Sequence, residues 1–179
     1  MTYIKLEKKI KSSDQKNTLS GVVYVPSDDI RGIFHLVHGM TEYIGRYEPL
    51  FESLAGEGYL CCGFDNLGHG NTANEQDLGF IASKIGWSYM VDDVKLFADS
   101  IKSDYPNVPY ILMGHSMGSF IVRLAAERYV KPTKLIIFDI YENNAYDIQQ
   151  ELKKNKYVKS YRLGVYGEGE DGVTIAEFR

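Results

Sequence analysis

Gly114-His115-Ser116-Met117-Gly118 is the stretch of this sequence that decides the fold. It lies between a short apolar run at 110–113 and a segment at 120–128 whose apolar residues recur at helical spacing. A G-x-S-x-G pentad in that context predicts a strand, a sharp turn and a helix, with the serine hydroxyl presented at the turn. An unassisted serine hydroxyl is a poor nucleophile, so a base must take its proton. The pentad therefore predicts a nucleophilic Ser116 whose base has still to be found.

Strands and helices are predicted to alternate on both sides of the pentad. Apolar runs at 32–37, 60–64 and 134–140 indicate buried strands, and helical spacing at 47–55 and 87–101 indicates packing helices. The β-branched and aromatic residues of 3–10 and 19–25 predict an opening antiparallel pair. This order is typical of an α/β fold, with a mostly parallel sheet and flanking helices.

Residues 138–179 change in character. A helix at about 145–152 and two strands, at 157–165 and 173–177, predict a β-α-β-β segment that completes the sheet and ends in a hairpin. We expect a single domain over 1–179, with a core at 1–137 and an atypical segment at 138–179. An unpaired edge strand in that hairpin would allow a homodimer to form by strand addition.

Two further motifs accompany the pentad, at 38–47 (HGMTEYIGRY) and 65–71 (DNLGHGN). Together the three resemble the monoacylglycerol lipase and lysophospholipase group of α/β-hydrolases, over roughly residues 3–135. The resemblance implies that Ser116 is the nucleophile and that the backbone N–H groups of Met40 and Met117 form the oxyanion hole. It implies small-molecule acyl esters as substrates, without a cofactor or a metal. The segment 65–70 and Arg46 would shape the loops around the site.

The histidines depart from this pattern. The triad of that fold runs serine, then aspartate or glutamate, then histidine. All four histidines, His35, His38, His69 and His115, precede Ser116. The further strands, lid, acid and late histidine of the family are not recognisable after about Ile137, which suggests a truncated, fused or rebuilt chain.

Two functions therefore remain open. The first is a serine hydrolase for esters such as monoacylglycerols or lysophospholipids, weak or inactive as the chain stands. The second is a catalytically silent module, with the same scaffold, that binds a ligand or a partner. A second chain could also supply the missing base within hydrogen-bond reach.

Several other polar residues have structural interpretations. We expect His38, His69 and His115 to be imidazoles hydrogen-bonded in a loop or at the turn. Asp92 and Asp93 on the long helix are expected at a solvated edge. The remaining candidates are Asp139, expected to be a strand-end carboxylate, and Cys61 and Cys62, expected to be inert core thiols.

Composition limits the partners and the compartment. The 179 residues carry a formal net charge of -4, and their lysines are scattered, so no basic field for nucleic acid is expected. The first thirteen residues have no apolar run typical of a signal peptide, and no segment has the length of a membrane span. The two adjacent cysteines suit a reducing compartment. The sequence thus predicts a cytoplasmic protein.

Overall fold

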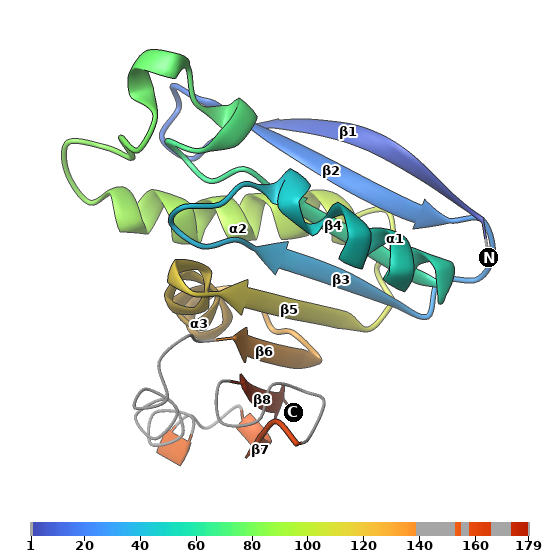
Figure 1. The fold of residues 1–179 in the computed structure, drawn as a ribbon. Helices are drawn as coiled ribbons and strands as arrows, with labels where there is room; N and C mark the ends of the chain where they lie inside the picture. Colours follow the sequence, from blue (N-terminus) through green and yellow to red (C-terminus); the bar gives the residue numbers. More distant parts are fainter. Residues whose placement is uncertain (1, 139–152, 155–157, 166–172, 179) are drawn as a thin grey trace.

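The computed structural model describes residues 2–138, 153–154, 158–165 and 173–178. Its described strands form one sheet in the order β1-β2-β4-β3-β5-β6-β8-β7 (Figure 1). The strands are β1 (Tyr3–Lys11), β2 (Thr18–Pro26), β3 (Gly32–Val37), β4 (Tyr59–Phe64), β5 (Tyr110–His115), β6 (Lys134–Phe138), β7 (Val158–Leu163) and β8 (Val173–Phe178). The helices are α1 (Glu48–Gly56), α2 (Gly86–Lys102) and α3 (Met117–Arg128), with short 3-10 turns at Ile44–Tyr47, Gly70–Thr72 and Glu75–Asp77.

The centre of the sheet is parallel and its margins are antiparallel. β3 pairs in parallel with β4 and β5, and β5 pairs in parallel with β6. β1 and β2 form the expected antiparallel pair, and β2 pairs antiparallel with β4. The predicted α/β fold with a parallel core is therefore confirmed, within a sheet that is mixed as a whole.

The predicted C-terminal hairpin is confirmed as a pairing of strands. β7 pairs antiparallel with β8, and β8 pairs antiparallel with β6, so this segment extends the sheet beyond its parallel centre. The predicted helix at 145–152, the turn at 167–172 and Asp139 lie outside the described residues. The division of the chain at residue 137 stays a prediction.

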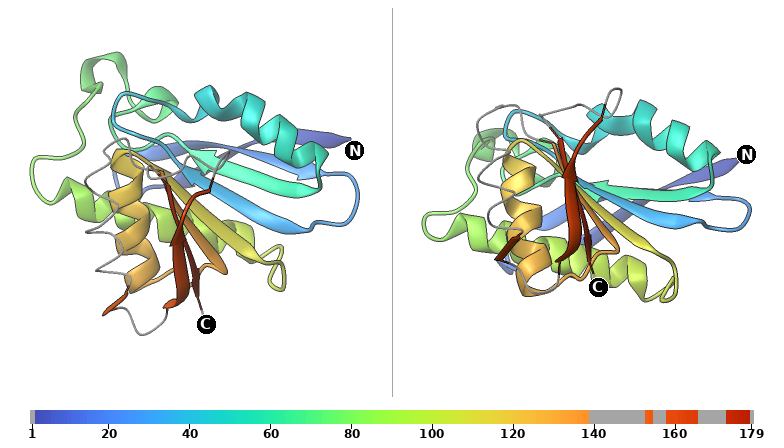
Figure 2. Two further views of the ribbon diagram at one scale, coloured as in Figure 1. Left: turned by 60° about the horizontal axis from the view of Figure 1, so that its bottom comes forward. Right: turned by 90° about the horizontal axis from the view of Figure 1, so that it is seen from below.

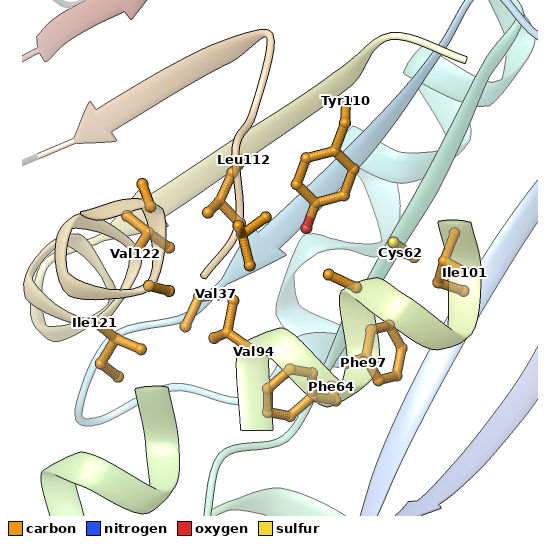
Figure 3. Close-up of a cluster of buried hydrophobic side chains, with 14 of the residues drawn as sticks. Val37, Cys62, Phe64, Val94, Phe97, Ile101, Tyr110, Leu112, Ile121 and Val122 are labelled. Atoms are coloured by element: carbon orange, nitrogen blue, oxygen red, sulfur yellow. The ribbon is translucent and has the colours of Figure 1, made fainter. Parts of the chain in front are cut away.

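Helices cover both faces of the sheet (Figure 2). On one face, α1 contributes Phe51 and Ala55 to a buried cluster with Tyr24 and Leu36. On the other face, α2 and α3 pack over a larger cluster, part of which is drawn in Figure 3. Cys61 and Cys62 are free and buried, one in each cluster. Among the described helices, none combines the length and the apolar content needed to cross a bilayer.

Asp93 corrects one expectation. It is fully buried rather than solvated, and its carboxylate accepts hydrogen bonds from the Ser12 hydroxyl, at 2.9 and 3.1 Å, and from the Ser13 N–H at 2.6 Å. The reason is positional, because Asp93 follows Met90 by three residues and precedes Phe97 by four, on the buried stripe of α2. Burial raises the pKa of this carboxyl despite its donors. Asp93 therefore fastens the turn after β1 to α2.

Candidate active site

Ser116 occupies a strained turn between β5 and α3, as the pentad predicts. Its backbone angles are φ 51° and ψ −119°, a region that residues other than glycine rarely adopt. The Ser116 N–H donates to the Phe138 carbonyl at 2.9 Å, and the buried Ser119 hydroxyl lies 3.0 Å from that oxygen and 3.0 Å from the Gly114 carbonyl oxygen. The last residue of β6 thus holds the turn, while the Ser116 side chain stays half-buried.

The two glycines of the pentad allow close approach of backbone to backbone. A methyl group on Gly118 would lie 2.1 Å from the Val37 carbonyl oxygen, and one on Gly114 would lie 2.4 Å from the Gly118 carbonyl oxygen. Both distances are far shorter than non-bonded atoms permit. Glycine at these positions lets the start of α3 press against the ends of β3 and β5, which meet at one edge of the sheet (Figure 1).

The loop after β3 lies against the serine. A methyl group on Gly39 would be 3.1 Å from the Ser116 Cβ atom. Neither Met40 N–H nor Met117 N–H donates to another residue that the structure describes. Met117 begins α3, where amides have no acceptor within the helix. The fold thus brings the segments of the two proposed oxyanion donors to the nucleophile, and their catalytic roles stay predictions.

Side chains hold the other polar backbone groups around Met40. The Gly39 N–H donates to Glu42 Oε2 at 2.8 Å, and the Gly39 carbonyl lies 2.7 Å from His38 Nδ1. The Met40 carbonyl lies 2.5 Å from His69 Nε2. Of the backbone N–H and carbonyl groups of Gly39 and Met40, the Met40 N–H is the one without a partner among the described residues.

Glu42 joins this loop to the pentad. Its Oε2 atom also accepts from the Tyr47 hydroxyl at 2.7 Å and from His115 Nδ1 at 2.7 Å, and its Oε1 atom lies 3.2 Å from the Arg46 guanidinium. Burial opposes ionisation, yet these donors lower the pKa of Glu42 to about 2. A buried carboxylate with this many partners is a fixed anchor rather than a proton carrier.

None of the four histidines hydrogen-bonds Ser116, and all four lie in the described part of the chain. His35 is in the core, where Nδ1 meets the Tyr110 hydroxyl at 2.6 Å. Both ring nitrogens of His38 and of His69 meet backbone groups, and His115 Nδ1 is held by Glu42. The expectation of hydrogen-bonded imidazoles in loops and at the turn agrees with these contacts.

The motif at 65–71 supports the loop after β3 that contains Met40. The buried Asp65 carboxylate accepts from the N–H groups of Ile44 and Asn71, each at 2.7 Å. The Asn66 N–H donates to His38 Nε2 at 3.0 Å, and the Asn66 side-chain amide donates to the His38 carbonyl at 3.3 Å. Sequence reasoning did not single out Glu42 or Asn66. The glutamate three residues after Gly39 was the available signal, since that spacing lets a side chain reach back to a backbone N–H.

A cavity of about 530 Å³ lies away from the serine, between the β1–β2 turn and the segment 68–84. Phe80, Ile81, Tyr89 and Lys16 are among its lining residues, whereas Ser116, Met40 and Met117 are not. It therefore adds nothing to the arrangement around the nucleophile. Within the described ranges, no three histidine, cysteine or acidic side chains gather closely enough to hold a metal ion.

Comparisons with known proteins agree with this geometry. The sequence profile of the family described as serine aminopeptidase, S33, matches residues 28–151. Monoglyceride lipase from Mus musculus is 38% identical over 104 residues, which are 58% of this chain and 33% of that lipase. The crystal structure of a carboxyl esterase from Bacillus coagulans superposes with a TM-score of 0.71 and 28% identity, covering 85% of this chain and 50% of that one. The chain thus spans half or less of both proteins.

A short stretch of the chain is similar to a different protein. Over 32 residues it is 66% identical to endonuclease MutS2 from Acetivibrio thermocellus, which is 18% of this chain and 4% of that protein.

Proposed function

The chain belongs to the serine aminopeptidase S33 family, and from that premise we propose that it reacts with carboxylic esters through Ser116. The named relatives, a monoglyceride lipase and a carboxyl esterase, support esters that carry an acyl chain, such as monoacylglycerols. Lysophospholipids are proposed from the resemblance of the three motifs alone. The observation that carries the proposal is the strained Ser116 beside two backbone amides without described acceptors.

The reaction follows from this arrangement. The Ser116 Oγ atom forms a bond to the ester carbonyl carbon, and the carbonyl electron pair moves onto the oxygen. The Met40 and Met117 N–H groups would hold that oxyanion in place. Collapse of the intermediate breaks the bond to the alcohol oxygen, which takes up the proton that Ser116 loses. Water then adds to the acyl-serine, and its cleavage releases the acid and returns a proton to the Ser116 Oγ atom.

The proton of Ser116 is the weak point of this reaction. Each histidine of the sequence precedes Ser116, and those near the serine are engaged with Glu42 or with backbone groups. Loss of the base in a serine hydrolase lowers kcat by about 10⁶, leaving about 10³ over water from the oxyanion hole and binding. We therefore expect slow turnover by the chain as it stands.

A second candidate is a catalytically silent module that retains the scaffold to bind an acyl ligand or a partner. The position of all four histidines before Ser116 favours it. It shares the fold and the turn geometry with the hydrolase, so only reactivity separates the two.

Active-site labelling combined with chemical rescue tests the proposal. The intact chain and Ser116→Ala are treated with an alkyl fluorophosphonate and assayed on a short-chain nitrophenyl ester, with and without added imidazole. We expect labelling that needs Ser116 and ester turnover that rises with imidazole, because the free base replaces the absent one. A folded chain that is not labelled, with turnover equal to that of Ser116→Ala at every imidazole concentration, would reject the hydrolase and favour the silent module.

A further inference from the structure

The peptide between Gly39 and Met40 determines where the first oxyanion donor points. A trans peptide is planar, and its carbonyl and N–H groups point in opposite directions. None of the described peptides is cis. Whatever holds the Gly39 carbonyl therefore also aims the Met40 N–H. The group that holds this carbonyl is His38, whose Nδ1 lies 2.7 Å from the oxygen.

The tautomer of His38 is fixed by its other ring nitrogen. A backbone N–H is always a donor, so the contact of 3.0 Å from the Asn66 N–H requires His38 Nε2 to be an acceptor. The proton must then reside on Nδ1, from which it is donated to the Gly39 carbonyl. His38 is fully buried, and burial lowers its pKa, which keeps the ring neutral.

We propose that His38, held as the Nδ1–H tautomer by the Asn66 backbone, is a positioning residue that aims the Met40 N–H at the acyl oxygen. This inference rests on the proposed reaction of Ser116 with esters. It also gives this buried imidazole a role in the reaction without any contact with Ser116 or with the proton that Ser116 must lose.

Two amide substitutions at His38 separate the contributions of its two ring nitrogens. The side-chain nitrogen of asparagine can occupy the place of Nδ1, so His38→Asn keeps a donor for the Gly39 carbonyl. Glutamine reaches the place of Nε2 instead, so His38→Gln keeps a partner for Asn66 but leaves that carbonyl without its donor. Both variants bury one neutral amide, which makes each the control for the other.

The rate of Ser116 labelling is measured with a P=O fluorophosphonate and with its P=S analogue. The P=O oxygen accepts hydrogen bonds from the oxyanion donors, whereas sulfur is a weak acceptor. Loss of one oxyanion donor lowers kcat by about 10²–10³, and a donor that is only misaligned should lower the rate by about 10-fold to 100-fold. We expect that loss for His38→Gln with the P=O reagent alone, and recovery of most of it in His38→Asn.

The outcomes are distinguishable. If the unaltered chain is not labelled at all, the proposed reaction fails. If it is labelled and both variants react at its rate, or if His38→Gln slows both reagents equally, the role of His38 is overturned.

A measurement that needs no reactivity completes the test. The ¹⁵N spectrum of the histidine rings in the unlabelled protein should show His38 with its proton on Nδ1, and the Met40 amide should shift in His38→Gln but less in His38→Asn. A proton on His38 Nε2, or an imidazolium at neutral pH, would overturn the proposal even in a chain whose serine is inert.

Discussion

His35 should make the protein sensitive to acid. The side chain is fully buried between Phe64 and Phe97, whose rings lie 5.9 and 5.2 Å from the imidazole, and its Nε2 atom has no partner within the described residues. Burial lowers the pKa of His35 from 6.5 to about 3. The unfolded chain takes up a proton below pH 6.5, while the folded chain stays neutral at this site until about pH 3. Stability is therefore lost as the pH falls through that window.

The size of this loss of stability follows from the two pKa values of His35. Between about pH 7.5 and about pH 4.5 the free energy of unfolding should fall by about 2.7 kcal/mol through His35 alone, with a slope that approaches about 1.36 kcal/mol per pH unit below pH 6.5. Urea unfolding of the unaltered chain and of His35→Asn, at about pH 7.5 and about pH 4.5, measures the two slopes. The variant is less stable at both values, because it leaves a cavity, but its loss between them should be smaller by about 2.7 kcal/mol. Equal losses in the two proteins would refute the reasoning.

Two further predictions concern a buried charge and a close contact at the candidate site, and a third substitution serves as a control. Glu42→Gln should destabilise the fold by about 3 kcal/mol at neutral pH, because a pKa lowered from 4.5 to about 2 marks a carboxylate that folding stabilises. The difference from the unaltered chain should shrink as the pH falls from 4.5 towards 2 in urea titrations, and a difference that does not change with pH would contradict it. Gly118→Ala should cost about 3 kcal/mol or more, because its methyl group meets the Val37 carbonyl. Gly56→Ala, also in a helix but with open space around the new methyl group, should instead stabilise by about 0.5–1 kcal/mol, and equal melting temperatures for the two alanine variants would show that the contact at Gly118 is unimportant.

Local patterns of the sequence were sufficient for the parallel centre of the fold. The apolar runs that became β3 and β4 fill buried strands, the run that became β5 alternates buried with half-buried residues, and the spacing of apolar residues in α2 and α3 matches one helix face. The pentad also placed Ser116 at the turn, because Gly114 is required by contact with Gly118 four residues on, whereas Gly118 itself is required by Val37 on another strand. Features decided by neighbours in sequence were therefore predictable.

Features that depend on residues far apart in the sequence were not predictable from local patterns. Asp93 is buried because Ser12 and Ser13 reach it from another part of the chain, and no local pattern announces those donors. Glu42 is a mixed case, because its bond to the Gly39 N–H had a local signal, whereas its partner His115 is 73 residues away. The order of strands beyond β6 depends on the β7–β8 hairpin, whose residues lie outside the match to the recognised family.

The shared acceptor at Phe138 has a mechanical consequence. Its carbonyl restrains the Ser116 N–H and the Ser119 hydroxyl, and its strand is braced on the outer side by β8, where Phe138 is opposite Val173. If the pairing between β6 and β8 opened, the backbone at Ser116 would lose part of its restraint, on the side remote from any bound ester. Tags, fusions or crosslinks attached near β8 should then alter how fast the serine is acylated without touching the residues that surround it.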